Sequence, residues 1–134
     1  MSYIPKYILK RMIPKDAVSI DGDDIVVAMT NVISPISIDE IPEDVLNYLE
    51  VKVDGDIVIS GDQPEAGKSL RIKWEDKTFT LDNIDEAIGE TLPVGGKMTI
   101  MFKNPGLKSG DTHEFEVTIK ADNPINIKFK RAIQ

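Results

Sequence analysis

The single histidine, His113, is the side chain best suited to acid–base chemistry, because an imidazole titrates near neutral pH. A Ser-His-Asp triad would have to use it. It follows the turn Ser109-Gly110-Asp111 at the start of a strand pattern, without a nucleophile-elbow motif. One histidine and no cysteine exclude a metal site built on several histidines or on thiolates. We predict that His113 is a turn or strand-end residue, and we assign no catalytic residue.

A second candidate is residues 61–69 (GDQPEAGKS), which resemble a phosphate-binding P-loop. The spacing is one residue too long, and Pro64-Glu65 removes a donor N–H and adds negative charge where phosphate would lie. A P-loop also leads into a helix, whereas the residues that follow have strand character. These residues are therefore predicted to form a polar loop between strands.

Carboxylates form the third candidate. A glycosidase needs two of them facing each other across a cleft, and a calcium loop needs a twelve-residue pattern with a closing Glu. Here the acids fall at predicted turns and helix starts, where Asp and Glu have local structural roles. We predict solvation and capping for these clusters, and no metal or cofactor bound by this chain. The clusters are Asp21/Asp23/Asp24, Asp54/Asp56, Glu75/Asp76 and Asp82/Asp85/Glu86.

The elements that position these side chains are predicted by alternating apolar residues, the pattern of strands with one buried face. Residues 97–120 show it most clearly, as two strands around a Pro-Gly and Ser-Gly-Asp connection. Asp54-Gly55 predicts a hairpin turn. Further strands are predicted over residues 24–33, 49–53, 56–60, 70–74, 78–81 and 125–129.

Helical content is predicted to be small, with short turns over residues 42–48 and after Asp82, which would cap the second. Residues 3–13 alternate loosely between Pro5 and Pro14, and proline suits an edge strand. The predicted fold class is all-β: a single β-sandwich or jelly-roll-like domain over residues 1–134, with 1–14 as an edge strand or arm.

Composition limits the partners. The 134 residues carry a formal charge of −7, which would repel nucleic acid and anionic membranes. No apolar run is long enough for a membrane span, and the N-terminal residues lack the apolar region of a secretory signal. The absence of cysteine excludes a disulfide framework. The cytoplasm is the expected location.

Two segments have competing interpretations. Trp74 with Tyr3, Tyr7 and Tyr48 would suit a sugar-stacking platform, but its alternation with Leu70 and Ile72 favours a place in the core. The irregular segment Ser34, Pro35, Ile36 and Ser37 is either a partner-facing loop or a crossover packed on the domain's own core, and both interpretations stay open.

An ordered set of short motifs resembles the small β-subunit family of C-glycoside deglycosidases. The set starts with the Asp54-Gly55 hairpin, followed by residues 77–81 (KTFTL) before a short acidic helix. The pair Gly95-Gly96 then leads into a strand that ends in residues 104–107 (NPGL), and Gly110 precedes residues 113–117 (HEFEV). Each motif is common by itself, so the resemblance depends on their order.

The resemblance implies a β-sandwich subunit that pairs with a larger α-subunit, a sugar-isomerase-like barrel with a divalent metal of the Mn or Mg type and the general base. Such a complex cleaves the C–C bond between a 3-oxo sugar and an aromatic, flavonoid-type aglycone. The ketone acidifies a neighbouring C–H, and loss of that proton permits an elimination that expels the aglycone. This chain would be the accessory subunit of that carbon–carbon lyase, without catalytic residues of its own.

Two other functions stay open. One is a stand-alone carbohydrate- or protein-binding β-sandwich. The weaker one is a small hydrolase that uses His113 with paired acids.

Overall fold

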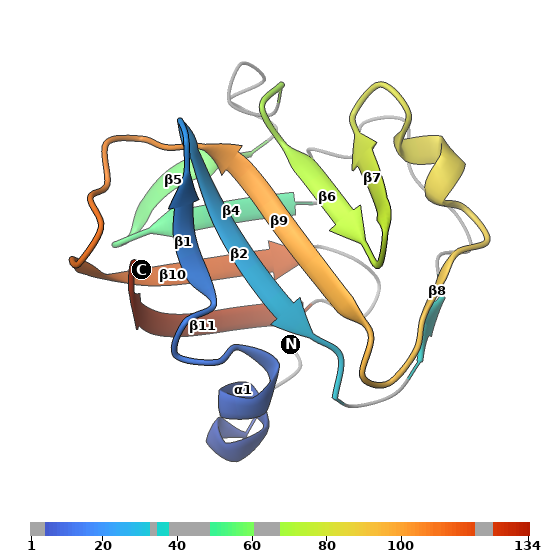
Figure 1. The fold of residues 1–134 in the computed structure, drawn as a ribbon, viewed down its shortest axis with the longest axis horizontal. Helices are drawn as coiled ribbons and strands as arrows, with labels where there is room; N and C mark the ends of the chain where they lie inside the picture. The colour runs from blue at the N-terminus through green and yellow to red at the C-terminus, as the bar shows by residue number, and fades with distance from the viewer. Residues whose placement is uncertain (1–4, 33–34, 38–48, 61–67, 120–124) are drawn as a thin grey trace.

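Two antiparallel sheets packed face to face form the body of the computed structural model, which describes residues 5–32, 35–37, 49–60, 68–119 and 125–134 (Figure 1). The predicted all-β sandwich is therefore confirmed. The five-stranded sheet has the order β1 (Val18–Asp21), β2 (Asp24–Thr30), β9 (Lys97–Lys103), β6 (Arg71–Trp74) and β7 (Lys77–Thr80). The four-stranded sheet has the order β11 (Ile125–Ala132), β10 (Thr112–Ile119), β4 (Leu49–Val53) and β5 (Asp56–Ile59).

Alternation along the strands builds the core between the sheets, as the sequence pattern predicts. In β2 the residues expected on one side, Ile25, Val27 and Met29, are all buried. Ile25 lies opposite the buried Phe102 of β9. From the other sheet, the rings of Phe115 and Phe129 stack with centroids 5.5 Å apart, an arrangement that adds to the burial of both rings.

The two strands within residues 97–120 belong to different sheets, so the connection between β9 and β10 crosses the sandwich. Asn104 shapes its first turn: its Oδ1 accepts the backbone N–H groups of Gly106 (2.9 Å) and Leu107 (2.6 Å). Its Nδ2 donates to the Leu107 carbonyl at 2.8 Å. Gly106 has a φ of +119°, a conformation that favours glycine.

The expected edge strand near the N-terminus is wrong, because residues Lys6–Met12 form helix α1. Leu9 and Met12 pack against the core and Ile13 is fully buried, which is the i, i+3, i+4 spacing of a helix that covers a core with one face. Pro5 stands at the helix start, where proline is as well suited as on an edge strand, and Leu9 N–H donates to its carbonyl.

Three smaller elements also differ from prediction. The strand β1 was not predicted, nor was the two-stranded sheet of β3 (Ile36–Ser37) and β8 (Thr91–Leu92). The second helical turn exists as a 3₁₀ helix, η2 (Ile84–Ala87), but Asn83 precedes it in place of Asp82. The helical turn predicted over residues 42–48 lies outside the described residues.

Arg131 holds the N-terminal segment to the four-stranded sheet. Its Nη2 donates to the Ile13 carbonyl at 2.5 Å, and its Nε lies 3.2 Å from the carbonyls of Ile13 and Pro14. The guanidinium also stands 5.7 Å from the centroid of the Phe129 ring. Burial lowers the pKa of Arg131, but a guanidinium stays charged at neutral pH. Arg131 therefore holds the residues that follow α1 against the four-stranded sheet.

We expect Arg131→Ala to lower the free energy of unfolding by about 1.5 to 3 kcal/mol, because charge-assisted hydrogen bonds to two carbonyls are lost together. Denaturant unfolding measures the change. Lys128→Ala, on the same strand but with only a 3.5 Å ion pair to Glu114, serves as the control and should change stability by less than about 1 kcal/mol. Equal effects of the two substitutions would contradict this role of Arg131.

Candidate functional site

Asp54 connects the β4–β5 hairpin to the start of β10. It has a φ of 52° and Gly55 a φ of 87°, the two left-handed residues of a tight hairpin turn, so the Asp-Gly prediction is confirmed. The Asp54 N–H donates to the Glu114 carbonyl at 2.7 Å. In return, the Glu114 N–H donates to Asp54 Oδ1 at 2.9 Å. The turn is thus tied to the neighbouring strand from both sides.

His113 completes this arrangement, with its Nδ1 2.6 Å from Asp54 Oδ2. An ionised carboxylate has only acceptors, so Nδ1 carries the proton and donates it. The Glu114 N–H and then the His113 hydrogen bond hold the pKa of Asp54 below its usual value, with a further contribution from the charge of Lys130. The two residues are 59 positions apart, and only the register of β4 beside β10 brings them together.

The second ring nitrogen decides what this pair can do. In an Asp-His pair that serves catalysis, Nε2 faces the nucleophile or the substrate. Here His113 Nε2 is buried and has no hydrogen-bond partner among the described residues. No substrate atom can reach it in this conformation. The geometry therefore makes the pair a structural clamp, in agreement with the prediction of a strand-end residue.

The acidic clusters do not converge on one point. Within the described ranges, no group of three or more His, Cys, Asp or Glu side chains could hold a metal ion. Asp24 instead pairs with Arg71 across the five-stranded sheet, with Nη2 and Oδ2 2.5 Å apart. Of the P-loop-like segment, residues 61–67 lie outside the described part, and the strand β6 follows it as predicted.

The segment considered as a partner-facing loop lies beside β8. Ser34 is outside the described residues, while Pro35 and Ser37 are exposed. Ile36 pairs with Leu92, and the hydroxyls of Ser37 and Thr91 are 3.0 Å apart. The segment thus forms half of the small β3–β8 sheet, and its role toward a partner stays a prediction.

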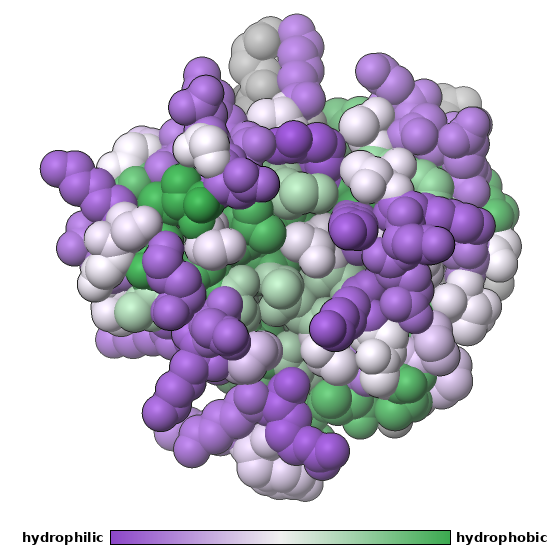
Figure 2. Space-filling model, viewed as in Figure 1, coloured by the Kyte–Doolittle hydropathy of each residue, from purple (hydrophilic) through white to green (hydrophobic). Residues whose placement is uncertain are grey.

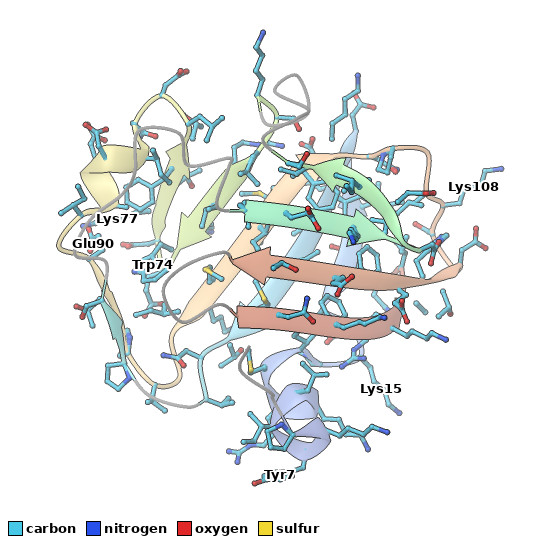
Figure 3. All side chains as sticks on the ribbon, turned by 180° about the vertical axis from the view of Figure 1, so that it is seen from behind. Tyr7, Lys15, Trp74, Lys77, Glu90 and Lys108 are labelled. Atoms are coloured by element: carbon cyan, nitrogen blue, oxygen red, sulfur yellow. The ribbon has the colours of Figure 1, made fainter. Side chains whose placement is uncertain are left out.

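Trp74 lies in a second, smaller core, so it is not part of an exposed stacking platform. Only 7% of it is exposed, and it packs with Phe79, Ala87 and Leu92. Nearby, Lys77 and Glu90 form an ion pair that raises the pKa of Lys77 (Figure 3). Tyr7 is 70% exposed and projects from α1 at the far end of the molecule, whereas Tyr3 and Tyr48 lie outside the described residues.

No protein-family model and no curated protein matches the chain. Helix α1 is too short to cross a bilayer, and the rest of the described chain holds no helix that could.

We predict that Asp54→Asn lowers the free energy of unfolding at pH 7 relative to the wild-type protein. This difference in stability should shrink as the pH falls below 3.8. The pKa of Asp54 is lowered from 3.8 in the folded protein, so the unfolded chain takes up the proton first. The stabilisation by the carboxylate is present above pH 3.8 and is lost as the pH falls through the folded-state pKa. Denaturant unfolding between pH 7 and pH 3 measures this.

Asp56→Asn is the matched control, since it removes the same charge from the same hairpin without touching the hydrogen bonds between Asp54 and β10. If the loss of stability in Asp54→Asn is constant from pH 7 to pH 3, the ionised Asp54 carboxylate does not stabilise the protein through its hydrogen bonds to β10.

Proposed function

We propose that this chain is the accessory β-subunit of a heteromeric C-glycoside deglycosidase, a lyase for the C–C bond between a 3-oxo sugar and an aromatic, flavonoid-type aglycone. One observation carries the proposal: the motifs of the resemblance occupy turns and strands of an all-β sandwich. Asp54-Gly55 forms a tight hairpin, β7 leads into η2, and residues 104–107 form the turn after β9.

The arrangement of the described residues supports an accessory role. The Asp54–His113 pair keeps Nε2 inside the protein, and the described acids do not gather into a metal-binding group. The chemistry then falls to the larger α-subunit, a sugar-isomerase-like barrel with a divalent metal and a general base. That base removes the proton beside the ketone and a C=C bond forms. The aglycone leaves with the electron pair of the broken C–C bond and takes up a proton at that carbon.

A subunit without catalytic groups still contributes to such a reaction. By covering the mouth of the partner's active site it excludes water and restricts the motion of the loops that hold the substrate. A sandwich suits this task because its loops are held by a rigid core. We therefore expect this chain to be inactive alone and to raise the activity of its partner.

Co-expression with the neighbouring open reading frame, where that frame encodes such a barrel protein, tests the proposal. We expect the two proteins to co-purify and a 3-oxo C-glycoside to be cleaved only when both are present. The α-subunit alone is the control. Failure to co-purify would contradict the proposal, and sugar binding by the isolated chain would favour a stand-alone binding module instead.

A further inference from the structure

The outer face of the five-stranded sheet carries side chains that alternate away from the core. Val26 of β2 lies opposite Met101 of β9, and Met101 in turn lies opposite Arg71 of β6. One step along the strands, Ala28 lies opposite Thr99. Their neighbours in sequence, such as Val27 and Ile100, point into the core, so these residues form continuous rows on the opposite side of the sheet.

The centre of this outer face is small and weakly polar. Ala28 is exposed, and Val26, Thr99 and Met101 are half-buried. Figure 2 shows the result as a pale, slightly sunken area over β2 and β9, with strongly polar side chains projecting around it. A flat centre of small residues with an adaptable methionine suits contact with another protein surface.

The rim of the same face is basic, in contrast to the chain as a whole. Lys73, Lys97 and Lys103 are exposed at positions that share the outward direction of Met101 and Arg71. Acids also lie at its edges: Asp24 pairs with Arg71, and the exposed Asp21 lies opposite Asp24. At the start of β9, Glu75 Oε2 lies 3.5 Å from the backbone nitrogen of Lys97. The four basic side chains, Arg71 and the three lysines, still outnumber these three acids. The whole chain carries 23 acidic and only 16 basic residues, so the face has the opposite sign to the protein that bears it.

The outer face of the four-stranded sheet has a different character. Glu116 lies opposite both Lys52 and Lys128, so acids and bases alternate across the strands. Lys128 Nζ also lies 3.5 Å from Glu114 Oε1. Charges balanced in this way within one chain suit contact with water. Among the residues that the structure describes, only the outer face of the five-stranded sheet has an excess of one sign of charge around an apolar centre.

We propose that the outer face of the five-stranded sheet is a docking surface for a protein whose contact area is apolar at its centre and acidic at its rim. The charge of the rim selects this occupant. A second copy of this chain docked through the same face would place lysines against lysines. The inference rests on the proposed function, in which the occupant is the larger α-subunit.

The test compares two charge reversals in the co-expressed complex. Lys73→Glu combined with Lys97→Glu changes the rim of the docking surface, and Lys128→Glu combined with Lys130→Glu makes the same change of charge on the other sheet. We expect the first pair to weaken the affinity about tenfold or more and the second to leave it within about threefold. Ala28→Glu, at the apolar centre, should weaken it as well.

Thermal unfolding of each variant chain shows that it is folded before affinity is measured. If the wild-type chain binds and the rim variant binds equally well, the docking surface is wrong while the proposed function stands. If the wild-type chain does not bind the barrel protein, both are overturned. Binding of the isolated chain to a DNA oligonucleotide, abolished by the same rim variant, would replace the protein partner by a nucleic acid.

Discussion

The core between the two sheets, to which Phe102 and Phe115 both belong, is the constraint on which the structure depends. The two side chains come from adjacent strands in the sequence but from different sheets, and each is at most 2% exposed. β9 is the middle strand of its sheet and β10 an inner strand of the other, so one short segment supplies the interior of both layers. The Asn104 turn and the Asp54–His113 clamp lie at the two ends of this crossing, where the chain leaves one sheet and enters the other.

Local pattern accounts for much of this fold. Alternation placed Ile25, Val27 and Met29 on one side of β2, and Asp-Gly fixed the β4–β5 turn, because both signals act over a few residues. The helix α1 could not be predicted, because two prolines suit an edge strand as well as the flanks of a helix. Only the burial of Leu9, Met12 and Ile13 distinguishes the helix from the strand. The Asp54–His113 pair depends on strand register, which no short pattern specifies.

The outer faces of the two sheets differ in the charge of their side chains. On the four-stranded sheet, acidic and basic side chains lie opposite each other on neighbouring strands, so the charges of this face are balanced within the chain. The five-stranded sheet leaves lysines around small apolar residues, on a protein that is otherwise acidic. The accessory role that we propose would use such an asymmetry, with one face toward a partner and the rest toward water.

The second core has a spectroscopic consequence. Trp74 is the only tryptophan, and it belongs to the cluster with Phe79, Ala87 and Leu92 and not to the main core. Its buried indole N–H lacks a partner among the described residues, which favours emission at short wavelength. Intrinsic fluorescence therefore follows the part of the molecule that carries β8, while circular dichroism follows both sheets. Met98 packs against both clusters, and β6 pairs with β9, so coincidence of the two signals during unfolding would show that the two clusters unfold together.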